Sequence, residues 1–495
     1  MKILLLNPGW LLKKEDADFF RISQPDSLGY IAAALKEAGH NVRLIDAAST
    51  GWKESCFSEG NVYFGMHIKK IIEEIRLFSP NLIGVPLISS FLKNNGFFAL
   101  SKIKKAFPDI LTVVGGAHAT VAVEECLQKE FIDFVVIGEG EKTTLELANE
   151  LSAKNPEFEK IDGLAFKRKN GIVINKKREL ISNLDALPFP SRELYPMDNY
   201  FIAAKKLIST FALSTYGKKW ATVITSRGCP YNCIFCSIYL SMGRKWRPRS
   251  PENVILEIEQ LIQDYGIEYI AFLDDNMSLD KSRMKRICEL IISRKLRIKW
   301  STPNGLRADT LDESLLRLMK KSGCERIAVA AESGSQRVVD QIIGKNLQLT
   351  EVVRVVSMCK KIGLKVDCFF VMGLIGETKK DLGMTVDFAR HLHKIGVSGL
   401  NIAIATPFPG TEFYKQCIEK KLISTNFDKF TMFRGDFYIA TEDFSAEELR
   451  MYKKRADKII FFHKDYLRFL ILLLLNDPLK FIRFFINHIK MFLKT

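Results

Sequence analysis

Features of secreted and membrane-spanning proteins are missing from this 495-residue sequence. No secretory signal is visible at Met1-Lys2-Ile3-Leu4, and the ten cysteines are mostly single and scattered, so a disulfide framework is not expected. The run Phe469 to Leu475 holds seven apolar residues, far fewer than the ~20 that cross a bilayer. Low-complexity segments are also absent. We therefore expect a reduced, cytoplasmic chain of two or three domains, whose 47% hydrophobic residues can fill sizeable cores.

Cysteine is concentrated at one place only. Cys229, Cys233 and Cys236 have no Cys-x-x-Cys or His-x-x-x-His partner nearby, which argues against a zinc site. Gly228 and Pro230 predict a loop, and loops rarely bury apolar thiols. Three closely spaced thiolates can instead hold three irons of a cubane cluster, whose fourth iron stays open to a small chelating molecule. The other cysteines are expected to fill the core: Cys56, Cys126, Cys288, Cys324, Cys359, Cys368 and Cys417.

The first 150 residues alternate apolar runs with segments of helical periodicity. This alternation predicts a doubly wound parallel sheet, whose ligands bind at the carboxyl ends of the strands. Three glycine-containing turns follow predicted strands, at 7–9, 115–118 and 138–141, where glycine lets the backbone approach a large ligand. The expected strands are 2–7, 42–46, 82–88, 111–114 and 134–137, and the expected helices are 28–38, 67–78 and 99–107.

Residues 151–215 are predicted to connect two domains. Residues 162–164 and the alternating residues 172–175 indicate a small hairpin, and residues 184–190 form a proline-stiffened linker. From 216 to about 430, strands and helices alternate again, with polar residues at the strand ends where a β/α barrel builds its site. We expect a partial barrel of about six strands: 223–225, 269–273, 300–303, 326–331, 366–372 and 399–405.

Residues 431–495 are predicted to form a helical, basic segment. Residues 445–448 have a capping-box pattern, and the last 45 residues hold ten Lys or Arg against three Asp. Two interpretations stay open: the segment lies on an anionic membrane surface, or it packs on the barrel as a lid. Apolar and basic residues alternate there at helical spacing: Phe481, Ile482, Phe485, Ile489 and Phe492, with Lys480, Arg483, Lys490 and Lys494.

The spacing Cys-x-x-x-Cys-x-aromatic-Cys resembles the signature of the radical S-adenosylmethionine (SAM) superfamily. Cys229, Cys233 and Cys236 match the three ligands of its [4Fe-4S] cluster, and Phe235 matches the aromatic position beside the adenine of SAM. The resemblance implies that SAM chelates the open iron and is cleaved to a 5'-deoxyadenosyl radical, which abstracts hydrogen from unactivated carbon.

The strand-end motifs after the cysteines extend this resemblance to a SAM site. Asp274 and Asp275 match the place where the methionine amino group is held, and Glu332 with Ser333 the place where ribose or carboxylate is contacted. The other matching positions are Asn304, Arg307, which can balance negative charge, Gly373 of the adenine-facing strand, and the late loop Pro407 to Thr411. Any single motif could equally be a helix cap or a surface turn.

The N-terminal turns resemble those of the cobalamin-binding domain that precedes many radical SAM domains, and the segment 184–190 resembles the linker between the two. The motif Asp-x-His-x-x-Gly, whose histidine ligates cobalt, is absent, so His118 is expected to line the cofactor site or cap a helix. A domain that keeps the fold without the cofactor is the alternative. The cobalamin-binding residues that the resemblance implies are Asn7, Ser89, Gly115, Gly116, His118, Gly138, Glu139 and Gly140.

Together these features predict a cobalamin-dependent radical SAM enzyme with four segments: a cobalamin-binding domain (1–150), a linker (151–215), a radical SAM partial barrel (216–430) and a C-terminal segment (431–495). The resemblance implies methylation of an unactivated carbon of a hydrophobic or natural-product substrate, such as a lipid or isoprenoid, and an electron donor such as flavodoxin or ferredoxin. The alternatives are oxidative cyclisation or hydroxylation without methyl transfer, a cobalamin-free radical SAM enzyme, and a non-enzymatic iron-sulfur or nucleic-acid-binding module. The net charge of +16 gathers at the apolar tail rather than in an aromatic-basic groove, so no nucleic acid is expected.

Overall fold

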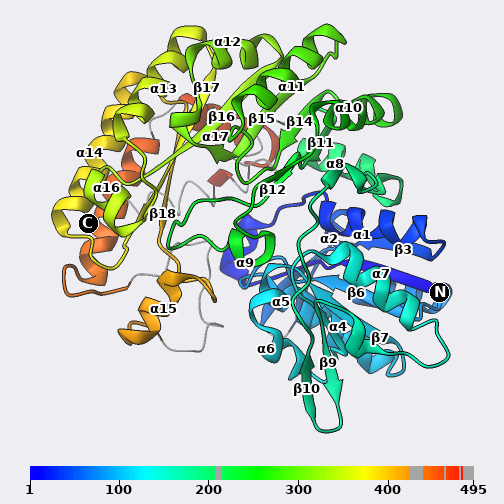
Figure 1. Ribbon diagram of the computed structural model, residues 1–495. Helices are drawn as coiled ribbons and strands as arrows, with labels where there is room; N and C mark the ends of the chain where they lie inside the picture. Colours follow the sequence, from blue (N-terminus) through cyan, green and yellow to red (C-terminus); the bar gives the residue numbers. More distant parts are fainter. Residues whose placement is uncertain are drawn as a thin grey trace. The chain divides into compact units, whose positions relative to one another are not determined.

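Two sheets of mostly parallel strands organise the chain in a computed structural model (Figure 1). The structure describes residues 1–58, 60–206, 215, 217–423, 439–461, 464–478 and 481–482. The first compact unit comprises residues 1–200, 226–250 and 406–436, and the second comprises 201–225, 251–405 and 437–495. These units are interrupted in sequence, whereas the predicted domains are continuous stretches. Residues 226–250, here called the cysteine segment, belong to the unit that contains the N-terminal sheet.

The sheet of the first unit has the strand order β10-β9-β8-β7-β6-β1-β3. All five predicted strands form, and neighbours among them run parallel. After β1 the chain passes to β3 on one side, and later strands add on the other side. The order therefore reverses between β1 and β6, the point at which doubly wound sheets bind ligands. The five strands are β1 (Lys2–Asn7), β3 (Asn41–Asp46), β6 (Leu82–Pro86), β7 (Leu111–Gly115) and β8 (Phe134–Val136).

Two features of this unit differ from the expectation. The predicted hairpin forms as β9 (Leu164–Arg168) and β10 (Gly171–Ile174), but β9 pairs antiparallel with β8 and extends the sheet instead of lying in a separate linker. A small antiparallel sheet of β2 (Trp10–Leu12), β4 (Ser55–Ser58) and β5 (Asn61–Phe64) was not predicted. Its strands have three or four residues, too few to show a clear alternation.

Helices cover both faces of the N-terminal sheet. α3 (Ile68–Phe78), α4 (Lys93–Ala106), α5 (Ala117–Val121) and α6 (Val123–Leu127) share one core with inward residues of β1, β6, β7 and β8. α1 (Asp26–Glu37) packs on α7 (Gly140–Glu150). The remaining helices of this part are α2 (Ala47–Thr50), α8 (Met197–Ala204), which runs across the boundary of the two units, and α15 (Glu412–Glu419).

The cysteine segment folds as a closed loop on the first unit. β12 (Ser226–Arg227) pairs antiparallel with β13 (Arg247–Pro248), so the two ends of the loop lie side by side. Between them lie the three cysteines and the short helix α9 (Ile238–Met242). Beyond β13, Ser250 donates its backbone N–H to Asp185 Oδ1 at 2.9 Å, so the proline-containing linker is packed against this segment.

The second unit contains the predicted six-stranded sheet, in the order β11-β14-β15-β16-β17-β18 with every pair parallel. Successive helices pack on one another along its outer side (Figure 1). The strands are β11 (Trp220–Val223), β14 (Tyr269–Phe272), β15 (Lys299–Leu306), β16 (Cys324–Glu332), β17 (Lys365–Met372) and β18 (Gly399–Ile404). The helices are α10 (Pro251–Tyr265), α11 (Lys281–Ser293), α12 (Glu313–Lys321), α13 (Leu349–Ile362) and α14 (Lys379–Ile395).

The C-terminal segment begins with α16 (Ala446–Phe461), which packs on α14, and continues with α17 (Lys464–Asn476). The predicted capping box is confirmed: Ser445 N–H donates to Glu448 Oε2 at 2.9 Å, and Glu448 N–H donates to Ser445 Oγ at 3.1 Å. Among the described residues, no helix combines the length and apolar composition of a bilayer span. Of the predicted amphipathic tail, Lys480, Arg483, Phe485, Ile489, Lys490, Phe492 and Lys494 lie outside the described residues.

Candidate active site

The three clustered cysteines lie half-buried in the irregular loop between β12 and α9. Backbone hydrogen bonds shape this loop: Cys229 N–H donates to Gly243 O at 3.3 Å, and Cys236 N–H donates to Cys233 O at 3.0 Å. Phe235 is half-buried in the same loop. In the described part of the chain, no three His, Cys, Asp or Glu side chains converge on a single metal ion. A cubane does not need such convergence, because each thiolate binds a different iron.

The remaining cysteines differ from these three in their surroundings. Burial raises the pKa of the Cys126, Cys288, Cys359, Cys368 and Cys417 thiols to about 12, and it raises that of Cys324 well above its usual value. A metal ligand must be a thiolate, so these protonated side chains are poor ligands at neutral pH. Their predicted place in the core is confirmed for these six.

At the switch point of the N-terminal sheet, an apolar side chain is exposed. Ile88, in the loop after β6, is 53% exposed, and Ser89 and Ser90 follow it half-buried. On the other side of the switch point, Asn7 ends β1 and donates its amide N–H to Asp46 Oδ1 at 2.8 Å. Its side chain is therefore directed toward β3.

Asp46 ends β3 and is fully buried beside Asn7. Burial raises the pKa of Asp46 to about 6, although hydrogen bonds from Tyr200, Ser49 and Asn7 favour the ionised carboxylate. Tyr200 lies in α8, so this polar cluster ties the segment after the linker to the end of β3. The sequence reasoning missed both residues, because a single Asp at a strand end resembles an ordinary helix cap.

The glycine turn after β7 places its backbone directly against the loop after β6. Gly116 has φ +101°, and a Cβ atom there would lie 2.9 Å from Leu87 O. His118 N–H donates to the same carbonyl at 3.0 Å. Both turns therefore meet at the carboxyl edge of the sheet, as predicted for a ligand site.

His118 does not face this edge. Its ring is 1% exposed, with Nδ1 3.0 Å from Ser90 Oγ and Nε2 3.5 Å from Glu125 Oε2. Phe97 packs edge-on against it at 6.2 Å between ring centroids. The ring thus supports the loop after β6, and its contact with a cofactor stays a prediction. The expectation that this histidine caps a helix is not met, because Gly116 occupies that position.

Glu139, for which contact with cobalamin stays a prediction, is held by donors from the protein. Its carboxylate accepts from Arg227 at 2.9 Å and from Arg247 at 2.8 and 2.9 Å, and it accepts the Ile181 N–H at 2.8 Å. Its three donors all come from the cysteine segment or from the chain before it. Gly138, at φ +79°, and Gly140, the first residue of α7, position this carboxylate.

In the second unit, Asp274 binds Thr225, which lies just after the end of β11. It is 2% exposed and accepts from Thr225 N–H at 3.1 Å and from Thr225 Oγ1 at 2.6 Å. Arg283 donates to Thr225 O at 2.8 Å. Thr225 directly precedes the cysteine segment, so Asp274 orients the chain where it leaves the barrel. Asp275 is half-buried beside it, and the exposed Asn304 donates to Leu273 O at 2.8 Å.

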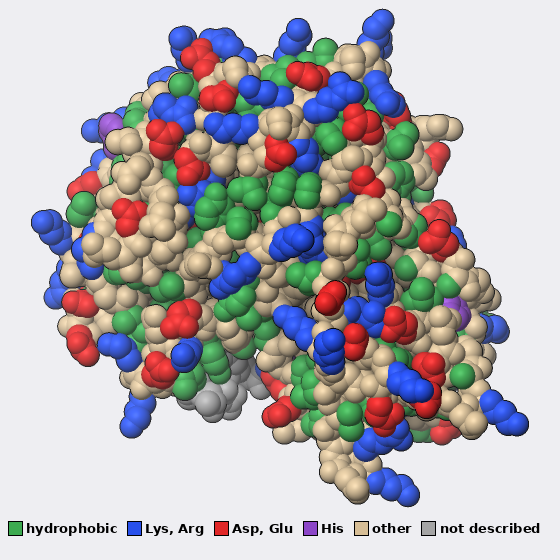
Figure 2. Space-filling view, in the orientation of Figure 1, with side chains coloured by type: hydrophobic (Ala, Val, Ile, Leu, Met, Phe, Trp, Pro, Cys, Tyr) green, Lys and Arg blue, Asp and Glu red, His purple; other side chains and the backbone are tan. Residues whose placement is uncertain are grey.

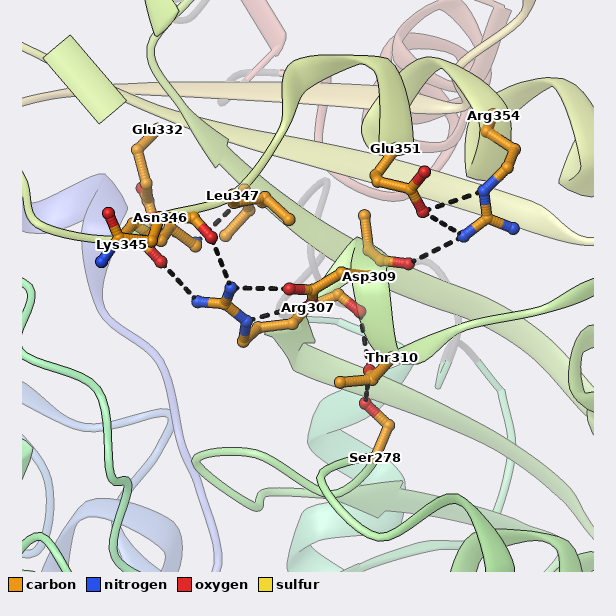
Figure 3. Close-up of polar contacts among 12 residues, drawn as sticks. Ser278, Arg307, Asp309, Thr310, Glu332, Lys345, Asn346, Leu347, Glu351 and Arg354 are labelled. Carbon is orange, nitrogen blue, oxygen red and sulfur yellow. Dashed lines mark hydrogen bonds and ion pairs between the residues drawn. The ribbon is translucent and has the colours of Figure 1, made fainter. Parts of the chain in front are cut away.

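Arg307 is occupied by protein partners (Figure 3). Its guanidinium forms two bonds to Asp309, at 2.7 and 3.1 Å, and donates to the carbonyls of Lys345 and Asn346 at 2.8 and 3.2 Å. In this structure Arg307 compensates Asp309, and its predicted compensation of a ligand's negative charge stays a prediction. This pair could have been predicted from the sequence, because Asp309 lies only two residues after Arg307.

Glu332 ends β16 in a left-handed conformation, with φ +66°. It is 8% exposed and pairs with Lys345 at 2.7 Å, and Lys345 also donates to Ala330 O at 2.7 Å. Left-handed backbone at a non-glycine residue is costly and is concentrated at functional sites, which supports the prediction that Glu332 serves the site. Lys345 was missed, because it is 13 residues away in sequence.

Ser333 and Gly373 are engaged inside the unit. Ser333 is fully buried, with Oγ 3.0 Å from Thr385 Oγ1 of α14, and its contact with SAM stays a prediction. Gly373, at φ +92°, lies against α16, where a Cβ atom would come within 2.6 Å of Leu449 Cδ2. Glu377 Oε2 accepts the N–H groups of Gly373 and Leu374 at 2.6 and 2.7 Å.

Comparison with known families and proteins agrees with the two folds. Residues 223–389 match the family model of the radical SAM superfamily, and residues 23–148 match that of the B12 binding domain. The chain is 34% identical over 436 residues to an uncharacterised methyltransferase of Pyrococcus horikoshii, with 87% of this chain and 86% of that protein covered. It is 30% identical over 452 residues to the cytidylyl-2-hydroxyethylphosphonate methyltransferase of Streptomyces wedmorensis, with coverages of 85% and 82%.

A solved structure has the same fold. The radical SAM methyltransferase TsrM from Kitasatospora setae, described with cobalamin and a [4Fe-4S] cluster bound, matches with a TM-score of 0.67 and 18% identity. The match covers 85% of this chain and 78% of that chain.

The residues of this chain fit the cofactors of such proteins. Three thiols share one loop, as a cubane with an open iron requires. Ile88 is exposed in the loop after β6, and the glycine turn after β7 lies directly against this loop, where backbone without side chains suits the close approach of a large ring system. This chain therefore belongs to the cobalamin-dependent radical SAM enzymes, the family that includes these methyltransferases.

Proposed function

We propose that the protein methylates an unactivated carbon of a hydrophobic or natural-product substrate, using a [4Fe-4S] cluster to cleave SAM. The observation that carries the proposal is the loop of Cys229, Cys233 and Cys236, half-buried and unlike the protonated core cysteines. Similarity over more than four-fifths of two methyltransferases favours methyl transfer over cyclisation or hydroxylation. When bound, the cluster, SAM and cobalamin would supply the radical and the methyl group.

The chain's own residues would bind and orient these groups. The three thiolates would hold the cluster, and Phe235 would lie beside the adenine. Thr225, held by Asp274 and Arg283, would set the direction from which the cysteine segment leaves β11. Glu332, in its left-handed conformation, would present one carboxylate oxygen to SAM while Lys345 holds the other. The glycine turns after β7 and β8 would leave room for the corrin ring.

The test is anaerobic purification with cobalamin, followed by assays for 5'-deoxyadenosine and for label from methyl-labelled SAM. We expect 5'-deoxyadenosine from the wild type and none from Cys233→Ala, because one iron then has no ligand. Cys56→Ala removes a lone, half-buried thiol and should behave as the wild type. Label missing from a converted product would contradict methylation and favour cyclisation or hydroxylation. Cluster absorbance without corrinoid bands would contradict the dependence on cobalamin.

We also propose that an anionic membrane surface brings the enzyme to a lipid-like or isoprenoid substrate. α17 carries a stripe of exposed apolar side chains at helical spacing, namely Leu467, Ile471, Leu474 and Leu475, with exposures of 45–73%. Phe469, Leu470 and Leu473 are buried on its other side. Such a helix, within a strongly basic sequence, suits the boundary of an anionic bilayer.

An electron donor such as flavodoxin or ferredoxin would reduce the cluster.

A further inference from the structure

The two ends of the cysteine segment, which folds as a closed loop, carry arginines that face each other. Arg227 in β12 and Arg247 in β13 are direct partners in the antiparallel ladder. Like charges directly opposite one another destabilise a strand pair. Both side chains are also buried, with exposures of 7% and 2%, so water does not screen their repulsion. The closed loop therefore requires a buried negative charge between the arginines.

Glu139 supplies that charge. Its Oε1 accepts from Nη1 of Arg227 and from Nη1 of Arg247, each at 2.9 Å, and its Oε2 accepts from Nη1 of Arg247 at 2.8 Å. Glu141 binds the second Nη of Arg227 at 2.6 Å. Glu139 and Glu141 are 7% and 5% exposed, so two buried positive charges are balanced by two buried negative ones. We call these four residues the charge clamp.

The charge clamp is anchored on the N-terminal sheet. Glu139 lies in the turn between β8 and α7, and Glu141 lies in the first turn of α7. Gly138 N–H donates to Thr120 Oγ1 at 2.9 Å, which fixes the start of this turn. Arg227 also lies 5.1 Å from the centroid of the Tyr30 ring in α1. The clamp thus joins the carboxyl edge of β8 to both ends of the cysteine loop within one compact unit.

A chain of direct contacts leads from Glu139 to a cysteine. Arg247, held by Glu139, donates through Nη2 to Met242 O at 2.8 Å. The next residue, Gly243, accepts the Cys229 N–H at 3.3 Å. Gly228, at φ +84°, lies close against the backbone of residues 242–245. A Cβ atom at this position would lie 2.5–3.1 Å from three of their carbonyl oxygens. The position of Cys229 therefore depends on the clamp.

We propose that Glu139 is a positioning residue for the iron-sulfur cluster, which it places relative to the N-terminal sheet and whose reduction potential it sets through its charge. This inference rests on the proposed function, because it requires a cluster on the three cysteines. Glu139 touches neither the cluster nor a substrate. It acts through Arg227 and Arg247, because Glu141 alone would leave one of their two positive charges uncompensated beside the cysteines.

The test compares Glu139→Gln with the wild type after anaerobic reconstitution of the full chain with iron and sulfide. Three quantities are measured: iron per chain, the EPR spectrum of the reduced cluster, and its midpoint potential. We expect Glu139→Gln to bind less iron and to show a more positive potential, since one unit of negative charge is lost nearby and the reduced cluster is the more negative form. Glu146→Gln is the matched control, because Glu146 lies on α7, the helix that follows Glu139, and pairs with Arg178, outside the cysteine segment.

A double variant separates charge from position. Glu139→Gln with Arg247→Gln removes one charge of each sign, so the potential should return toward the wild-type value while the iron content stays low. If circular dichroism shows that Glu139→Gln alone does not fold, the double variant takes its place in the test. Wild-type iron content and potential in both variants would overturn the inference and leave the proposed function standing. A wild-type protein that takes up no cluster would instead overturn the proposed function.

Discussion

Three buried glutamates lie next to strand ends in this protein, and each is neutralised in a different way. Glu139 is held by two arginines, Glu332 is paired with Lys345 at 2.7 Å, and Glu377 accepts only backbone N–H groups. In the described residues, Glu377 Oε1 has no hydrogen-bond partner. Burial raises the pKa of Glu377 to about 7. The Glu377 carboxyl is therefore partly protonated at neutral pH.

Glu377 should make the second unit less stable as the pH rises. Its ordinary pKa is 4.5, so between about pH 5 and 8 the folded state holds a proton that the unfolded state has released, and stability falls with increasing pH. Glu377→Gln keeps an acceptor for Gly373 and Leu374 and removes this dependence. We expect the unfolding free energy of the variant, relative to that of the wild type, to increase by on the order of 2–3 kcal/mol from pH 5 to pH 8.

Chemical unfolding at the two pH values measures this difference. Glu447→Gln, an exposed change in α16, controls for the general effect of removing a carboxylate. Equal pH dependence in the wild type and in Glu377→Gln would contradict the prediction.

At the scale of elements, the ladder of β12 and β13 allows the cysteine segment to fold as a closed loop. Its backbone path needs a glycine before Cys229, because Gly228 has φ +84° and carbonyl oxygens of Lys245, Met242 and Gly243 surround its Cα. An alanine there would meet Lys245 O at 2.5 Å. The loop and the ladder are therefore compatible only without a side chain at this position.

Gly228→Ala should lower the unfolding midpoint and the iron content of the reconstituted protein. Gly39→Ala is the matched control, because Gly39 has nearly the same φ of +83° but no atom within 4 Å of the added Cβ. The control carries only the cost of the left-handed backbone, roughly 1–2 kcal/mol. Thermal unfolding and iron analysis should show a larger loss for Gly228→Ala. Equal losses in the two variants would mean that the carbonyl contacts can relax.

At the scale of the whole molecule, positive charge is widespread. On the face shown in Figure 2, Lys and Arg side chains are interspersed with Asp and Glu and do not form one continuous basic groove. The apolar stripe of α17 is a more specific feature, because four large side chains are exposed on one helix face. Isolated exposed apolar residues are common, but a contiguous row usually marks an interaction surface.

The protein should sediment with vesicles that contain anionic lipid, and less so at high salt. Replacing Ile471 and Leu475 by Glu should abolish this binding, because both side chains would have to enter the apolar boundary. Leu77→Glu in α3 is the control, since Leu77 is 79% exposed outside this segment. Absence of binding by the wild type would contradict the membrane proposal and favour the lid interpretation, and binding that survives the double change would show that the apolar stripe of α17 does not carry it.

The sequence by itself determined the family and the elements. The three cysteines, the alternation of strands and helices and the strand-end motifs predicted the family, both parallel sheets and most strand bounds, because spacing and periodicity are local properties. The tertiary structure alone decided the partners of the charged residues. Glu139 and Arg247 are 108 residues apart, and Asp274 and Thr225 are 49 apart. Folding brings them together, and burial then requires each charge to find a partner, which no local pattern specifies.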